Sequence, residues 1–213
     1  MHARTRWRLA PEGWPFVLPL AMASGLALAL AWWIPAALLA VLGGGVAFFF
    51  RDPERQVPDT PGAVVAPADG RVIEVGQEAD GRPRVGIFLS LLDVHVNRAP
   101  YGGTVRSVTR RAGRFVAAYR RQAPQVNACT QVIIDSVDGE FTVTQIAGVL
   151  ARRIVCHVRP GDALVKGQRY GLIRFGSRTD LVLPRHADVC VQVGARVRGG
   201  ETILAFLKEP QRP

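Results

Sequence analysis

The stretch that organises this chain is Gly171-Leu-Ile-Arg-Phe-Gly-Ser-Arg-Thr-Asp-Leu-Val-Leu-Pro184. It places the pair Gly176-Ser177 between two β-like runs. Glycine has no Cβ and adopts backbone angles that are closed to other residues, so the carbonyl before Ser177 can be held in a strained geometry. A Gly-Ser pair in such a place is most often a turn. Other parts of the sequence must decide whether the pair also has a chemical role.

A serine that follows a strained carbonyl can attack it. Addition of the Ser177 Oγ to the Gly176 carbonyl carbon would replace the amide by an ester. An ester β to an acidic Cα–H can be eliminated to leave dehydroalanine, which hydrolyses to a pyruvoyl group. The stretch therefore allows a chain that cuts itself between Gly176 and Ser177 and makes its own ketone.

The N-terminal part of the chain has no charged residue from Trp14 to Phe50. One crossing of a bilayer needs about 20 apolar residues, so this run is too long for one straight helix. We predict a helical hairpin with arms at about 16–33 and 35–50. The turn falls at Trp32-Trp33-Ile34-Pro35, where aromatic rings suit the membrane interface and proline suits a helix start. Because each arm is short, a re-entrant hairpin in one leaflet stays open beside two full crossings.

Arginines flank this apolar run, with Arg4, Arg6 and Arg8 before it and Arg51 and Arg55 after it. Cytoplasmic flanks collect Arg and Lys, so we expect both ends of the hairpin and the rest of the chain at the cytoplasmic face of the cell membrane. A secretory signal peptide fits less well, because its apolar segment is usually only about 7–15 residues long.

The net charge of +10 comes almost wholly from arginine, since only Lys166 and Lys208 among the 27 basic residues are lysines. One cluster comprises Arg106, Arg110, Arg111, Arg114, Arg120 and Arg121. Guanidinium groups favour bidentate contacts with phosphate. Beside a membrane anchor, anionic lipid head groups match this cluster better than nucleic acid, for which the sequence shows no recognition motif. A solvated basic face is the alternative.

After a proline-rich linker at 51–62, the chain changes to short runs rich in Val and Ile, separated by Gly, Pro and Asp. These runs are 63–66, 70–75, 84–90, 103–109, 131–135, 140–146, 154–158, 170–174, 180–183 and 187–193. They predict a mainly β domain over 63–213, of sandwich or barrel-sandwich type, behind an N-terminal hairpin domain at 1–50. Ser136-Val-Asp-Gly139 predicts a hairpin turn. The phrases Gly161–Gly167 and Gly194–Gly200 are similar turn-and-strand units.

Two further phrases join the Gly-Ser stretch: Val65-Ala-Pro-Ala-Asp-Gly70 and Leu92-Asp-Val-His-Val-Asn-Arg-Ala-Pro100. Together with the apolar N-terminus that ends in Phe-Phe-Phe-Arg-Asp-Pro-Glu-Arg, they resemble the short form of the phosphatidylserine decarboxylase family over nearly the whole chain. The resemblance implies a proenzyme that is cleaved between Gly176 and Ser177. A large β chain (1–176) and a small α chain (177–213) would then form a heterodimer, with further oligomerisation left open.

The resemblance also implies the chemistry. Ser177 becomes a covalent pyruvoyl cofactor that forms a Schiff base with phosphatidylserine, releases carbon dioxide and gives phosphatidylethanolamine. Decarboxylation of an amino acid needs a carbonyl group as electron acceptor, and the common alternative to pyruvoyl is pyridoxal phosphate, which needs an anchoring lysine. Lys166 lies in a glycine-rich turn and Lys208 in the tail, so neither is a convincing anchor. The expected partners are the membrane and an anionic serine phospholipid, with phosphatidylserine and archaetidylserine both open.

In long-form relatives an Asp, a His and the cleavage Ser form a triad, and Asp69 matches that Asp. His95 matches the first of two family histidines, while the second falls on Arg98. We therefore expect His95 to donate or accept a proton in decarboxylation, and the base that drives self-cleavage stays open between His95 and another group. His157 and His186 are read as non-catalytic.

No metal site is expected. The histidines lack a metal-binding spacing, and Cys129, Cys156 and Cys190 are too few and too scattered for a zinc site or a disulfide framework. A different class of protein also fits the sequence: a membrane-tethered, lipoyl-like β domain that binds lipid or protein partners without catalysis. The intact mass separates the two, since only the enzyme is expected as two chains.

Overall fold

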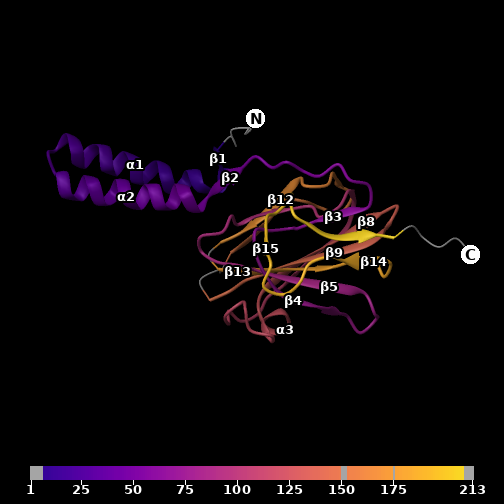
Figure 1. Cartoon of the computed structure of the whole chain (residues 1–213). Coiled ribbons are helices and arrows are strands. Elements are labelled where there is room, and N and C mark those ends of the chain that lie inside the picture. The colour runs from indigo at the N-terminus through magenta and orange to yellow at the C-terminus, as the bar shows by residue number, and fades with distance from the viewer. Residues whose placement is uncertain (1–6, 150–152, 175, 209–213) are drawn as a thin grey trace, which may run out of the picture. The chain divides into compact units, whose positions relative to one another are not determined.

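The computed structural model describes residues 7–149, 153–174 and 176–208, so Arg4, Arg6 and Phe175 of the patterns above lie outside the described residues. The chain divides into two compact units, residues 1–54 and residues 55–213. The first is built on helices and the second is mainly β (Figure 1).

The N-terminal unit contains α1 (Trp14–Ala29) and α2 (Trp33–Phe49), which confirms the predicted apolar helical pair. The turn comes earlier than expected, because Ala31 takes a positive φ of 58° and α2 begins at Trp33. Pro35 then lies in the first turn of α2, where a missing N–H costs no helical hydrogen bond. With the short helix η1 (Pro11–Gly13), the first arm gives a stretch of 19 residues at Pro11–Ala29 that is long and apolar enough to cross a membrane.

A small clasp closes the base of the helical pair. Strand β1 (Trp7–Leu9) pairs antiparallel with β2 (Arg51–Pro53). The Phe16 and Phe50 rings stack at 5.6 Å, beside Gly13. The sequence did not predict β2, which occupies the first residues of the expected linker. It forms because two antiparallel helices bring their flanking residues together, where exposed backbone groups can pair.

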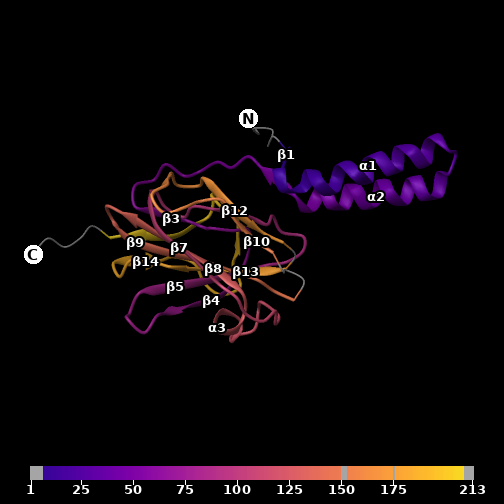
Figure 2. The same ribbon diagram turned by 180° about the vertical axis from the view of Figure 1, so that it is seen from behind.

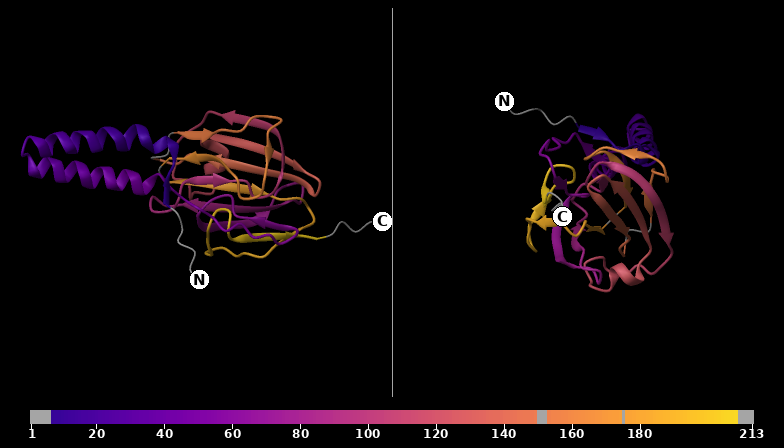
Figure 3. Two further views of the ribbon diagram at one scale, coloured as in Figure 1. Left: turned by 90° about the horizontal axis from the view of Figure 1, so that it is seen from above. Right: turned by 90° about the vertical axis from the view of Figure 1, so that its right-hand side faces the viewer.

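The β domain is built on one large antiparallel sheet in the order β11-β7-β8-β9-β13-β5-β4-β15. Its strands are β4 (Gly70–Gln77), β5 (Pro83–Leu89), β7 (Gly103–Arg111), β8 (Cys129–Ser136), β9 (Gly139–Ile146), β11 (Ala163–Leu164), β13 (Ser177–Val182) and β15 (Arg196–Val197). Seen end-on, the sheet curls around the domain (Figure 3).

Two three-stranded sheets, in the orders β10-β12-β6 and β14-β16-β3, complete the β domain. Their strands are β3 (Ala63–Val65), β6 (Val96–Arg98), β10 (Ile154–Cys156), β12 (Arg169–Ile173), β14 (Ala187–Val189) and β16 (Ile203–Leu207). A single turn of helix, α3 (Ala123–Val126), lies in the connection between β7 and β8 (Figures 1 and 2). This arrangement confirms the predicted mainly β, barrel-sandwich-like fold.

The two similar turn-and-strand phrases form the two edges of the large sheet. Strand β11 pairs with the start of β7, and β15 pairs with the start of β4. The contacts repeat: Gly161 N donates to Val105 O and Gly194 N to Val72 O, both at 2.8 Å. The expected hairpin turn is also present, since Ser136 pairs with Gly139, whose φ is 115°.

The hydrophobic core lies on one face of the large sheet. Ile87, Val143 and Leu181, from neighbouring strands, are all fully buried within one cluster. Successive side chains in a strand point to opposite faces. Along β13, Ser177 and Thr179 therefore share the face of Leu181, while Arg178 and Asp180 point to the other side. This alternation positions the site.

Candidate active site

Ser177 is the first residue of β13, a central strand paired with β5 on one side and β9 on the other. It pairs with Leu89 and is fully buried. Its Oγ has no hydrogen-bond partner among the described residues. Most buried polar atoms in proteins are hydrogen-bonded, so an unpartnered hydroxyl calls for a functional explanation.

Gly176 holds the backbone before this serine in the left-handed region, with φ at +61°. Its carbonyl oxygen lies against the backbone of Gly148, just after β9. A Cβ placed on Gly148 would come within 2.1 Å of that oxygen. Glycine is therefore required at two positions far apart in sequence, so that the Gly176 carbonyl can occupy its place.

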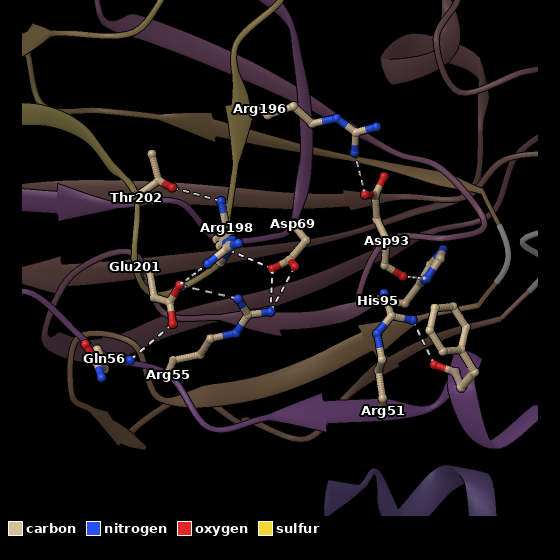
Figure 4. A network of polar contacts seen from close by, with 12 residues as sticks. Arg51, Arg55, Gln56, Asp69, Asp93, His95, Arg196, Arg198, Glu201 and Thr202 are labelled. Carbon is tan, nitrogen blue, oxygen red and sulfur yellow. Dashed lines mark hydrogen bonds and ion pairs between the residues drawn. The ribbon is translucent and has the colours of Figure 1, made fainter. Parts of the chain in front are cut away.

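His95 faces the Gly-Ser junction from the loop that precedes β6, and its side chain is fully buried. The Nδ1 atom lies 2.9 Å from the Asp93 carbonyl oxygen (Figure 4), and Gly176 N–H donates to Nε2 over 3.3 Å. A carbonyl only accepts, so Nδ1 carries the proton and Nε2 presents its lone pair to the junction. The ring is thus held as the tautomer that can act as a base there.

Asp93 fixes the loop that carries His95. Its carboxylate accepts hydrogen bonds from the N–H and hydroxyl of Ser90, at 2.8 and 2.6 Å, and from Arg196 at 2.8 Å. The residue stands in the quoted phrase around His95. Its role could not be separated from that of the histidine by sequence, because Asp93 contacts the ring through its backbone carbonyl.

Asp69 lies in a different network, visible in Figure 4. Its carboxylate accepts two hydrogen bonds from Arg55, at 2.9 and 2.8 Å, and one from Gly199 N–H at 2.8 Å. Within the described part of the chain, these are all of its hydrogen bonds, so the structure does not join Asp69 to His95. Burial raises the pKa of the Asp69 carboxyl, and the charge of Arg55 opposes the shift.

The structure describes some positions and contacts of the remaining sequence candidates. Arg98, at the second family histidine position, donates to the Gly167 carbonyl at 3.2 Å. His186 lies near Gly139, at the hairpin turn at the far end of β9 from Gly148. His157 is exposed and follows β10.

A buried chain of neutral polar side chains lines the core face beside Ser177. Gln145 Nε2 donates to Asn97 Oδ1 at 2.8 Å, and Asn97 Nδ2 donates to Thr179 Oγ1 at 3.1 Å. All three residues are fully buried. They come from three strands that are distant in sequence, β9, β6 and β13. Of the three, only Asn97 could have been noticed in the sequence, because it lies in the phrase around His95.

The described contacts of the two lysines lie away from the Gly-Ser junction. Lys166 donates to the Thr60 carbonyl and Lys208 pairs with Asp188, both at the surface. Within the described ranges, no three His, Cys, Asp or Glu side chains are grouped as metal ligands would be. The three cysteines are free thiols.

In this mainly β domain the central strand begins directly after a glycine at positive φ, with a buried, unpartnered serine hydroxyl and a histidine nitrogen 3.3 Å from the glycine N–H. This geometry would suit self-processing at the Gly-Ser pair. Comparison with known proteins agrees. A family model described as phosphatidylserine decarboxylase matches residues 43–205. The phosphatidylserine decarboxylase proenzyme of Nocardia farcinica is 46% identical over 210 residues, covering 93% of this chain and 87% of the relative.

Two further proenzymes of the same name are similar. That of Oleidesulfovibrio alaskensis is 42% identical over 207 residues, covering 94% of this chain and 95% of its own. That of Nitratidesulfovibrio vulgaris is 43% identical over 203 residues, covering 92% and 94%. The chain belongs to the phosphatidylserine decarboxylase family.

Proposed function

We propose that this protein is a phosphatidylserine decarboxylase that makes its own pyruvoyl group from Ser177 and converts phosphatidylserine to phosphatidylethanolamine. The observation that carries the proposal is the junction itself, in which an unpartnered, buried Ser177 hydroxyl follows a glycine held at φ +61° beside His95 Nε2. Family membership supplies the substrate class. It also disfavours the alternative of a non-catalytic lipid- or protein-binding domain.

The self-cleavage step uses this chain's own atoms. The Ser177 Oγ adds to the Gly176 carbonyl carbon, its proton passes to a base, and the C–N bond breaks to leave an ester and a free amine. Loss of the Ser177 Cα proton then expels the Gly176 carboxylate, and hydrolysis of the resulting enamine releases ammonia. His95 Nε2, which lies 3.3 Å from Gly176 N, is the base we assign.

The surroundings of Ser177 fit a pyruvoyl group. Strands β5 and β9 hold both sides of β13, and Thr179 and Asn97 provide uncharged polar contacts on the same face. A pyruvoyl carbonyl would withdraw electrons from the substrate as carbon dioxide leaves. His95 would hold or deliver the proton that the product needs at Cα.

Asp69 contributes indirectly in this proposal. Its ion pair with Arg55 leaves a buried carboxylate balanced by a buried guanidinium, with side-chain exposures of 14% and 6%. Because Asp69 also binds Gly199 N–H, it ties residue 55 to the turn between β15 and β16. We assign it the role of ordering this side of the site.

We further propose that the helical pair inserts into the cell membrane and that the β domain works at the cytoplasmic face. The chains 1–176 and 177–213 stay together after cleavage, because β13 belongs to the small chain and its two neighbours, β5 and β9, belong to the large chain. Separation would expose the core.

The proposal is tested by substituting Ser177→Ala. Alanine has no hydroxyl, so we expect one uncleaved chain and no carbon dioxide from phosphatidylserine, whereas the wild type gives two chains by intact mass and releases carbon dioxide. Ser136→Ala, in the hairpin turn at the other end of the sheet, is the matched control and should cleave normally. A new N-terminus at residue 177 in the alanine variant, or a single active wild-type chain, would contradict the proposal.

A further inference from the structure

We propose that three loops around the Ser177 end of the β domain form a rim that docks on an anionic phospholipid bilayer. We call the end of the large sheet at which β13 begins the Ser177 end. The inference rests on the proposed function, since it names the surface that presents the lipid substrate to the site. The evidence comes from charge, exposure and strand register.

The loops gather at one end because of the sheet's register. Ser177 pairs with Leu89 at the end of β5, and Arg178 pairs with Ile146 at the end of β9. Cys129, which begins β8, pairs with both Ile146 and Arg111, the last residue of β7. The segments 90–95, 112–128 and 147–149 therefore leave the sheet at the Ser177 end.

These segments are also joined by direct contacts. The Phe88 and Tyr119 rings meet edge to face at 5.9 Å. A Cβ on Gly148 would lie 3.4 Å from the Ala118 side chain and 2.1 Å from the Gly176 oxygen. The loop that carries Tyr119 thus borders the cleavage junction.

The rim exposes large apolar side chains that a soluble surface would normally bury. Leu92 is 73% exposed, Tyr119 62%, Val149 54%, Leu91 48% and Phe115 38%. Leucine and aromatic side chains at loop tips can insert into the interfacial region of a bilayer, where a tyrosine keeps its hydroxyl in the wet head-group layer.

Arginines without carboxylate partners accompany these side chains. Within the described residues, Arg114, Arg120 and Arg121 form no ion pair, and all three are exposed. By contrast, Arg106, from the same cluster, pairs with Asp135 and Glu140 on the sheet. The sequence from 112 to 134 contains no Asp or Glu. Free guanidinium groups beside exposed apolar groups match anionic head groups above an acyl layer.

The hairpin turn at the opposite end of the large sheet combines an exposed apolar side chain with negative charge instead. Val137, at the opposite end of the large sheet, is fully exposed, but it stands next to Asp138 in the hairpin turn. Apolar exposure there is accompanied by negative charge, which an anionic bilayer would repel. At the Ser177 end, by contrast, the segment 112–128 carries exposed apolar groups together with arginines that form no ion pair within the described residues.

The first test measures contact directly and does not depend on activity. A nitroxide is attached at Tyr119→Cys or Val137→Cys in the full chain, with the exposed Cys190 replaced by serine. The helical pair anchors the protein both to phosphatidylcholine vesicles and to vesicles that also contain phosphatidylglycerol. We expect the label at 119 to lose accessibility to a water-soluble relaxation agent only on the anionic vesicles, while the label at 137 stays accessible on both.

The second test separates docking from chemistry. We expect Arg120→Gln with Arg121→Gln to lower kcat/KM about tenfold for phosphatidylserine in vesicles, because each juxtamembrane arginine strengthens binding to an anionic surface severalfold. Turnover of dispersed short-chain phosphatidylserine should not change. The control, Arg159→Gln with Arg185→Gln, removes the same charge from exposed positions elsewhere on the domain.

Three results would contradict the proposal that the rim docks on the bilayer. These are equal accessibility at 119 on both vesicles, protection at 119 that rises with protein concentration in detergent, or an equal loss of turnover on both substrates. The second would indicate an interface between copies of the chain, and the third a role in the site itself. If the wild type released no carbon dioxide at all, the proposed function would fail, while the labels would still decide whether the rim docks.

Discussion

At the residue scale, the Gly176-Ser177 junction depends on Gly148, where the backbone leaves no room for a side chain. Gly148→Ala would push a methyl group against the Gly176 oxygen, which a Cβ would approach to 2.1 Å. We expect the carbonyl to move out of reach of Ser177, so that the cleaved fraction falls at least tenfold while the fold remains. Gly76→Ala is the control, because nothing lies within 4 Å of its added Cβ. Intact mass after a fixed incubation measures the effect, and full cleavage in the Gly148 variant would show that the contact is not needed.

His95 lies where a single ring could serve two steps. We expect His95→Ala to lower carbon dioxide release per cleaved chain by about 100-fold or more, the usual scale for a positioned proton donor. Because Nε2 also lies at Gly176 N, we expect slower cleavage as well, to a smaller extent. The cleaved fraction and the turnover per cleaved chain are measured on the same sample. Normal turnover per cleaved chain would remove His95 from decarboxylation.

The sequence could point to the residues to which we assign chemistry, but not to those that shape the space around them. Ser177 and His95 stand in distinctive phrases, whereas Gly148 and Gln145 act only through contacts across distant parts of the chain. The position of Asp69 was visible in the sequence, yet its pairing with Arg55 was not, because residue 55 stood in what was expected to be a linker.

At the element scale, the proposed cleavage requires β13 to remain ordered after the peptide bond before Ser177 is cut. Arg178, the second residue of the strand, is fully buried on its outer face. Its guanidinium pairs with Asp180 and with Glu74 on β4, above Gly86, which leaves room for it. Strand ends usually fray, and this ion pair holds residue 178, so a group formed at 177 would stay in register.

Removing that guanidinium should therefore weaken the domain. We expect Arg178→Met to lower the free energy of unfolding by about 3–5 kcal/mol, because the buried Asp180 carboxylate loses its nearest cation and, among the described residues, keeps only Arg84, at 3.9 Å. Arg71→Met, at an exposed arginine on β4, should cost less than about 0.5 kcal/mol. Urea unfolding of both variants, in the uncleaved Ser177→Ala background, compares them directly. Equal midpoints would mean that the pair contributes nothing.

The β domain should also lose stability at high pH through Tyr101. Burial and the hydrogen bond to Asp138 raise the pKa of Tyr101 to about 12, while the unfolded value is near 10. The folded state binds this proton more tightly, so its contribution is complete below pH 10 and is lost as the pH rises toward 12. The free energy of unfolding should therefore fall between pH 10 and 12. We expect this fall to be smaller in Tyr101→Phe by up to about 1 kcal/mol, since solvent screens a half-exposed pair. An unchanged slope between pH 10 and 12 would contradict this assignment.

Periodicity in the sequence located the strands but not their order. Runs such as 84–90 and 140–146 correspond to β5 and β9, because alternating Val and Ile report burial on one face. Placing β13 between those two strands requires knowledge of which distant strands pair, and local pattern does not contain it. The β1–β2 clasp was missed for the same reason.

At the scale of the whole molecule, the chain combines an apolar helical pair with a domain that has a core of its own. The buried cluster of the β domain runs from Val64 to Ala205 and draws on no residue of the helical pair. The helices show the reverse character, with Met22 and Leu38 about two-thirds exposed. Such surfaces suit lipid rather than water.

Removal of residues 1–54 should therefore separate anchoring from chemistry. The cut keeps Arg55, which Asp69 needs as its partner, and leaves the β-domain core intact. We expect the truncated chain to cleave itself and to act on dispersed short-chain phosphatidylserine, but to pellet with vesicles at least tenfold less than the full chain. A cut after residue 55 is the matched control, and it should cleave less well because Asp69 loses its guanidinium. If the first truncation is folded by circular dichroism yet stays uncleaved, the helical pair is part of the catalytic unit.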